Sequence, residues 1–211
     1  RDLFLVPDLL HKLLKTGKLG AKVGQGFYKK EKQQILSLNP DSLAYEPAKL
    51  GDLGDVEAIS KIDNLSDRLR ALYQDSGRGA TFFPQSTLAL LSYSACRITE
   101  ITDSPVELDR AMRWGFGWSV GPFELWDILG LEMVLADMKA AMLTVPAWVE
   151  TMRQNGGTSF YQGSHQNTQV YNGDRQNYLP LQLPTDEIRL ADLKADAGRT
   201  LWENSESALL D

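Results

Sequence analysis

The chain has 211 residues, a net charge of −6 and 43% hydrophobic residues, which is ordinary for one or two globular domains. The acidic balance argues against a nucleic-acid or anionic-membrane surface, because phosphate groups require a basic patch. No apolar run approaches the roughly 20 residues that a membrane-spanning helix needs. Cys96 is the single cysteine, so no intrachain disulfide can form, and a lone thiol indicates a reducing compartment, the cytoplasm.

The first segment is predicted to be a short helix followed by a glycine-rich loop. Residues 7–16 open with a proline and carry one stripe of leucines, and Gly17 can end the helix with left-handed backbone. The loop at residues 19–28 ends in an aromatic pair. Residues 31–54 are polar and hold two prolines and two glycines, so they are predicted to be a linker with little regular structure.

The middle of the chain is predicted to be mainly helical. Apolar residues at three- and four-residue spacing indicate an amphipathic helix over 55–75 and a longer, central helix over 82–101. Ser104 and Pro105 start the next helix, with the Glu107 side chain expected to reach back to the Ser104 amide. Further helices are expected from Gly121-Pro122, over 131–143 and from Pro146 to about residue 154.

The composition changes after Gly156. Residues 156–180 are rich in Gly, Asn and Gln, and short stretches such as residues 169–171 are predicted to be hairpin strands. Residues 185–211 are mixed and polar, which is typical of a connector or of the edge of another module.

A series of features occurs twice in the same order. Val6-Pro7 begins a short helix that leads through glycines to Phe27-Tyr28, and Val145-Pro146 begins a second series that ends in Phe160-Tyr161. Matched features in one order indicate a diverged duplication. The second series follows a helical front at residues 80–144 that the first lacks, and no Met opens the sequence. We therefore expect the sequence to start near the end of a first domain copy, within a longer protein.

Two motifs resemble the C-terminal domain of 3-hydroxyacyl-CoA dehydrogenases. Residues 19–28, Leu-Gly-Ala-Lys-Val-Gly-Gln-Gly-Phe-Tyr, are similar to the family's Leu-Gly-x-Lys-x-Gly-x-Gly-Phe-Tyr. Residues 108–127 resemble the family's Asp-x-Ala-Met-x-x-Gly-x-Gly-x-Pro-Met-Gly-Pro-Phe-x-Leu-x-Asp, with Ser119 and Val120 in place of Pro-Met. Some longer members of this family carry the domain twice, which agrees with the repeat.

The resemblance implies a fold and a domain plan. The implied fold is mainly α, a 6-phosphogluconate-dehydrogenase-C-terminal-like helical domain with a small irregular or β tail. The implied domains are the tail of a first C-terminal domain copy (1–30), a linker (31–54), a second copy (55–162) and a tail or connector (163–211). Within that connector, residues 189–193 and 201–204 look like the segment before a crotonase-type enoyl-CoA hydratase domain in fused enzymes.

The resemblance also implies an activity, NAD-dependent oxidation of 3-hydroxyacyl-CoA to 3-ketoacyl-CoA in fatty-acid β-oxidation. The family's base is a histidine paired with a glutamate on an N-terminal Rossmann domain, where a carboxylate can orient an imidazole that titrates near neutrality. NAD is expected to bind that domain in the full-length protein. The implied partners are acyl-CoA, NAD, the protein's own Rossmann domain and further copies in a homo-oligomer, with no nucleic acid and no membrane span.

Lys22 is the one residue that the resemblance makes a cofactor-binding candidate, because the matching lysine of single-copy members lies near NAD. The alternative is a solvated loop lysine. His11 lies on a lysine-rich helix and His165 in a Gly/Asn/Gln loop, so both are expected to be incidental. Gly20, Gly24 and Gly26 do not make a dinucleotide fingerprint, which requires a strand before the glycines and a helix after them. No catalytic residue is therefore expected in this chain.

Carboxylates and aromatic residues gather between residues 107 and 127. The carboxylates suggest either paired acids or, as we expect, favourable charges at helix N-termini and an ordinary Asp109–Arg113 pair. No His or Cys accompanies them, so no metal site is expected. The aromatics could line an acyl groove but are expected to be core and interface anchors: Trp114, Phe116, Trp118, Phe123 and Trp126.

The sequence thus predicts a helical part of a dehydrogenase that completes the acyl-CoA cleft and fixes domain or subunit packing, without turnover of its own. Two other functions stay open. One is a helical interaction or dimerisation module that only assembles proteins, and the other is an autonomous domain that binds a fatty acyl thioester. A Gly-x-Gly-x-x-Gly strand–turn–helix earlier in the parent gene would favour the dehydrogenase.

Overall fold

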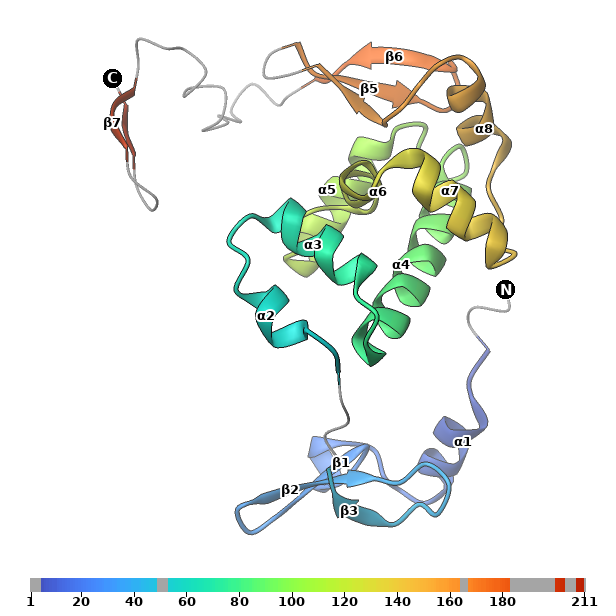
Figure 1. Ribbon diagram of the computed structural model, residues 1–211. Coiled ribbons are helices and arrows are strands. Elements are labelled where there is room, and N and C mark those ends of the chain that lie inside the picture. Colours follow the sequence, from blue (N-terminus) through green and yellow to red (C-terminus); the bar gives the residue numbers. More distant parts are fainter. Residues whose placement is uncertain (1–4, 49–52, 164–166, 183–199, 204–207, 211) are drawn as a thin grey trace. The chain divides into compact units, whose positions relative to one another are not determined.

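The chain divides between residues 52 and 53 into unit 1 and unit 2. A computed structural model describes residues 5–48, 53–163, 167–182, 200–203 and 208–210 (Figure 1). Within these ranges no helix is both long enough and apolar enough to cross a membrane. Helices dominate unit 2 and short strands follow them, so the expected mainly helical architecture with a small β tail is confirmed.

Unit 1 is a helix followed by a small sheet. Helix α1 (Asp8–Lys15) leads through a 3-10 turn (Ala21–Val23) to strands β1 (Tyr28–Glu31), β2 (Gln34–Leu38) and β3 (Tyr45–Pro47), which pair antiparallel in that order. The prediction of a linker with little regular structure over residues 31–54 is therefore wrong up to Pro47, because β2 and β3 lie there. Strands of three to five residues with few buried side chains give too weak an alternation to be seen in the sequence.

Unit 2 begins with helices and ends with strands. The helices are α2 (Val56–Ser60), α3 (Leu65–Gln74), α4 (Arg78–Arg97), α5 (Pro105–Phe116), α6 (Pro122–Leu129), α7 (Leu131–Ala140) and α8 (Ala147–Gln154). Strands β4 (Tyr161–Gln162), β5 (Gln169–Asn172) and β6 (Asn177–Pro180) form an antiparallel sheet, and β7 (Thr200–Glu203) pairs with β8 (Ala208–Leu210). The strand predicted at residues 169–171 is confirmed. The connector motif at 189–193 lies outside the described residues.

The helix predicted over 55–75 is two helices. The chain leaves α2 after Ser60, and Asn64 caps α3 by accepting a hydrogen bond from the Asp67 amide at 3.1 Å. A side chain that satisfies an otherwise unpaired amide favours a new helix start at that residue. Helix α4 also lies slightly earlier than predicted, because Ile98 has extended backbone and ends it.

The core of unit 2 is built around α6, which contacts α3, α4, α5 and α7 (Figure 1). Phe123 and Trp126 of α6 are fully buried and meet the Phe160 ring at centroid distances of 4.9 and 5.1 Å. Trp148 of α8 packs on the same ring and donates its indole N–H to the Ala95 carbonyl at 3.0 Å. Edge-to-face aromatic pairs add about 0.5–1.5 kcal/mol each beyond burial. The tail from α8 to β6 is therefore part of the core.

Unit 1 repeats this tail. Pro7 and Pro146 both have extended backbone and precede helices of eight residues. The same three backbone hydrogen bonds end the two helices. In unit 1 the amides of residues 16, 17 and 18 donate to the carbonyls of residues 12, 14 and 13, in that order. In unit 2 the amides of residues 155, 156 and 157 donate to the carbonyls of residues 151, 153 and 152.

The two sheets correspond residue by residue, 26–30 with 159–163 and 34–47 with 167–180. Tyr28 pairs with Ser37 and Tyr161 with Val170 in the same register. Matched positions hold the same residue at Phe27/Phe160, Tyr28/Tyr161, Asn39/Asn172, Asp41/Asp174, Tyr45/Tyr178 and Pro47/Pro180. The units differ between helix and sheet, where residues 19–25 of unit 1 stand in place of the single Thr158.

Candidate functional site

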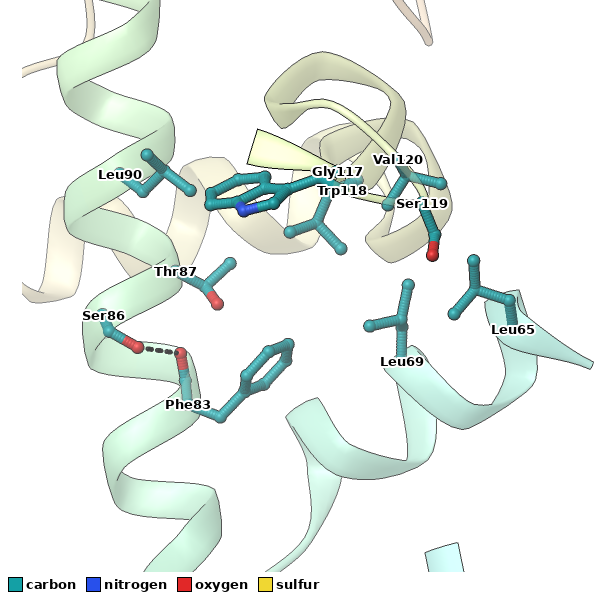
Figure 2. A pocket seen from close by; sticks show the side chains of 11 residues that line it. Leu65, Leu69, Phe83, Ser86, Thr87, Leu90, Gly117, Trp118, Ser119 and Val120 are labelled. Carbon is teal, nitrogen blue, oxygen red and sulfur yellow. Dashed lines mark hydrogen bonds between the residues drawn. The ribbon is translucent and has the colours of Figure 1, made fainter. Parts of the chain in front are cut away.

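An apolar pocket of about 570 Å³ opens on unit 2 between α3, α4 and the corner that joins α5 to α6. Figure 2 shows Leu65 and Leu69 of α3 facing the corner residues 117–120, with the Trp118 ring beside Leu90 of α4. The Phe83 ring forms another wall. This pocket, the α3–α4 pocket, therefore presents mostly hydrocarbon to a ligand.

The polar groups in the α3–α4 pocket are hydroxyls. The Ser86 hydroxyl donates to carbonyls of its own helix, at 2.8 Å to Phe82 and 3.1 Å to Phe83 (Figure 2). Thr87 and Ser119 also line the pocket. Among the residues that the structure describes, no acid, base or metal-ligating side chain lines the pocket. It therefore suits an apolar group and offers no proton-transfer chemistry.

The aromatic residues of the corner divide into three groups. Phe123 and Trp126 are core residues with no exposed surface, as expected. Trp118 lines the α3–α4 pocket. Trp114 and Phe116 are 69% and 73% exposed, and exposed rings of this size are typical of interface anchors.

Asp109 is fully buried and ties three segments together. Its carboxylate accepts hydrogen bonds from the Phe123 amide at 2.8 Å, the Glu124 amide at 3.1 Å and the Tyr161 hydroxyl at 2.7 Å. The two amides belong to the first turn of α6, where backbone N–H groups lack partners within the helix. Asp109 therefore caps α6 from α5, and the Asp109–Arg113 pair expected from the sequence is wrong.

Arg113 instead pairs with Glu124 at 3.2 Å. Glu124 in turn accepts a hydrogen bond from the Gly121 amide at 2.7 Å, as a residue in the first turn does in a capping box. The capping bond predicted for Glu107 is absent from this described segment, since Glu107 pairs with Arg110 and the Ser104 amide donates to Thr102. The glutamate half of a capping box thus lies one helix later than predicted, and Asp109 accepts the Glu124 amide in place of an N-cap side chain.

Asp127, near the end of α6, accepts two backbone amides as Asp109 does. Its carboxylate accepts hydrogen bonds from the amides of Phe160 and Tyr161 at 2.8 and 2.9 Å.

Burial raises the pKa of Asp109 and of Asp127 to about 7. The charge of Glu124 raises both pKa values further, while the hydrogen bonds to the two carboxylates oppose the rise. Burial and the nearby Asp109 also raise the pKa of the Tyr161 hydroxyl far above its usual range, so it stays a donor. Protein donors occupy both carboxylates, which are therefore structural.

Lys22 lies in unit 1, in the loop that unit 2 lacks. The loop closes on itself through the Gly20 amide and the Gln25 carbonyl at 2.8 Å. A Cβ on Gly26 would lie 2.8 Å from the Gly20 Cα, so this close approach requires glycine. Lys22 sits in the 3-10 turn and is exposed. The closed loop thus presents the Lys22 ammonium group to solvent.

Comparisons with known proteins agree with both motifs. The family described as "3-hydroxyacyl-CoA dehydrogenase, C-terminal domain" matches residues 82–170, from α4 to β5. Residues 82–170, less than half of the chain, are thus similar to this C-terminal domain. A "Probable 3-hydroxyacyl-CoA dehydrogenase" of Bacillus subtilis (strain 168) is 32% identical over 211 residues, which is all of this chain and 26% of that protein. A "Putative fatty acid oxidation complex trifunctional enzyme" of Rickettsia felis is 25% identical over 126 residues, 60% of this chain and 16% of that protein.

The chain thus spans about a quarter or less of the length of these relatives. Neither histidine lies within the corner motif at residues 108–127. His11 is exposed on α1, and His165 lies outside the described residues. The glycine loop joins α1 to β1, the reverse of the strand-before, helix-after order of a dinucleotide fingerprint.

Two features of the dehydrogenase domain escaped the sequence analysis. One is the pocket wall from α3, for which the apolar stripe predicted only an amphipathic helix. The other is the Tyr161–Asp109 bond, which joins residues far apart in the chain. The repeated Phe-Tyr pair was the available signal for Tyr161, but no spacing rule connects it to an aspartate on α5.

Proposed function

We propose that the chain is the C-terminal part of an NAD-dependent 3-hydroxyacyl-CoA dehydrogenase of fatty-acid β-oxidation, working in the cytoplasm. The end-to-end alignment of the whole chain with part of the Bacillus subtilis relative supports this most directly. The chain completes the acyl-CoA cleft and fixes domain packing. The test is an assay of the full-length protein for NADH formation from a 3-hydroxyacyl-CoA, and no turnover there would refute the proposal.

NAD chemistry would be supplied by a Rossmann domain of the full-length protein. The described residues do not fit a dinucleotide on their own, because the carboxylates of the corner are occupied and the glycine loop leads into a strand. The chain's contribution to the cofactor is Lys22, an ammonium that can offset the charge of a pyrophosphate. Lys22→Ala in the full-length enzyme is expected to raise the KM for NAD several-fold. Lys12→Ala, which removes an exposed lysine from α1, is the matched control and leaves that KM unchanged.

We also propose that the two units come from two copies of the C-terminal domain. The shared register and the shared helix ending support this. The repeat extends the tail of the first copy to Pro47, beyond the residue 30 expected from the sequence. The full-length enzyme is proposed to be a homo-oligomer held by exposed rings such as Trp114 and Phe116. Sedimentation of the wild type and of a Trp114→Ser variant tests this.

A second function, binding of a fatty acyl thioester by the chain itself, is favoured by the α3–α4 pocket. Its apolar lining and its volume of about 570 Å³ suit an alkyl chain. Calorimetric titration of an acyl-CoA into the chain tests this. Ser86→Trp places a ring in the pocket and abolishes such binding, whereas Gln85→Trp on the same helix does not. If neither turnover by the full-length protein nor acyl binding by the chain is found, the function that remains is that of a helical interaction module.

A further inference from the structure

We infer that a groove on unit 1 is the seat of an apolar helix equivalent to α6, supplied by a preceding copy of the domain. This rests on the proposed duplication. The groove is formed by α1 and the glycine loop and is defined by Leu10, Leu13, Leu14, Leu19 and Phe27. It has a volume of about 220 Å³ and will be called the unit 1 groove.

Large apolar side chains stand open to solvent around the unit 1 groove. Leu14, Leu19 and Phe27 are 60%, 57% and 50% exposed. Single exposed apolar residues are common, but a cluster that lines one concave surface marks a binding site. The surface is therefore expected to be covered in the working protein.

Unit 2 shows what covers the positions of Phe27 and Leu10. Phe27 corresponds to Phe160, which is completely buried because α6 packs Phe123 and Trp126 against it. Leu10 corresponds to Val149, which is also completely buried. The tail of unit 2 is thus closed by α6, and residues 5–48 contain no counterpart of that helix.

The polar contacts define the occupant further. In unit 2, the Asp127 carboxylate accepts hydrogen bonds from the amides of Phe160 and Tyr161. These amides correspond to those of Phe27 and Tyr28 in unit 1. The occupant is therefore an apolar helix with two aromatic residues three positions apart and an aspartate directly after the second. Since α6 precedes α8 in the chain, the equivalent helix is expected to precede α1.

The test compares Phe27→Ala in two proteins, the 211-residue chain and the full-length parent. In the full-length protein Phe27→Ala is expected to lower the Tm of its domain by about 10 °C, because a packed ring is lost, and Phe160→Ala is expected to have a similar effect. In the 211-residue chain the same substitution is expected to change the Tm by less than about 2 °C. Ile35→Ala removes an exposed residue of β2 that does not line the groove and is neutral in both proteins.

Several outcomes overturn the inference. One is a neutral Phe27→Ala in the full-length protein, which means that the groove stays empty there. Another is an equal loss in both proteins, which means that the 211 residues fill the groove themselves. A gene that encodes nothing ahead of residue 1 also overturns it. A failure of the proposed activity is separate, because it is seen as missing NADH formation in the unsubstituted full-length protein while these Tm shifts need no turnover.

Discussion

Tyr45 and Tyr178 make the same hydrogen bond at matched points of the two units. Each phenol donates to the carbonyl of the residue before a Phe-Tyr pair, Gly26 at 2.7 Å and Ser159 at 2.5 Å. A buried or half-buried hydrogen bond of this kind contributes about 1 kcal/mol. The pair therefore links the sheet to the helix–sheet connection in both units.

The first prediction concerns these two tyrosines. Tyr45→Phe and Tyr178→Phe are each expected to lower the stability of their own unit by about 1 kcal/mol, because each removes one hydrogen bond and keeps the ring. Hydrogen exchange measured by mass spectrometry checks this peptide by peptide. Tyr45→Phe should speed exchange in residues 26–47 only, and faster exchange in residues 159–180 would contradict separate units.

The second prediction concerns Asp109. Asp109→Ala leaves the amides of Phe123 and Glu124 and the Tyr161 hydroxyl without their acceptor. The expected loss in the free energy of unfolding is about 3 kcal/mol or more, since unpaired buried donors cost roughly 1–3 kcal/mol each. Urea denaturation measures this loss. Glu57→Ala on α2 removes an exposed ion pair with Lys61 and is expected to cost less than about 1 kcal/mol.

The third prediction concerns the close approach of Gly121 to Asp109. A Cβ on Gly121 would lie 2.3 Å from the Asp109 Cα, so Gly121→Ala must push α5 and α6 apart. We expect a loss of about 3 kcal/mol or more, within the range of severe core strain. Gly115→Ala is the control, because nothing lies within 4 Å of its Cβ and alanine favours a helix by about 1 kcal/mol over glycine. Equal effects of the two substitutions in thermal unfolding would contradict this packing.

The fourth prediction is a pH dependence from Asp109 and Asp127. Their pKa values are raised to about 7 in the folded protein, against about 3.9 in an unfolded chain. The folded state therefore binds protons more tightly, and the contribution of these two groups is full below about pH 4 and is lost as the pH rises to 7. Carbon-13 NMR titration should show both carboxyl groups titrating near neutrality. In urea denaturation, Asp127→Asn should weaken the fall in stability between pH 5 and 7.5.

The sequence identified the family and the helical body well, because long motifs and three- and four-residue spacing are local signals. It failed where structure depends on partners. The strands at residues 34–38 and 45–47 were missed because short strands gain their stability from pairing, and the break at Asn64 was missed because one cap interrupted a continuous apolar stripe. The Asp109 cap was missed because a spacing of four residues from Arg113 favoured a local ion pair, while three buried donors elsewhere compete for the same carboxylate.

The proposed division of labour between this chain and the rest of a full-length dehydrogenase is tested most directly by a turnover measurement on the 211-residue chain alone. Purified chain is mixed with NAD and a 3-hydroxyacyl-CoA, and the absorbance of NADH is followed. The prediction is no NADH formation above the uncatalysed background, because the corner carboxylates are occupied and His11 lies exposed on α1. NADH formation that scales with the concentration of the chain would contradict this account.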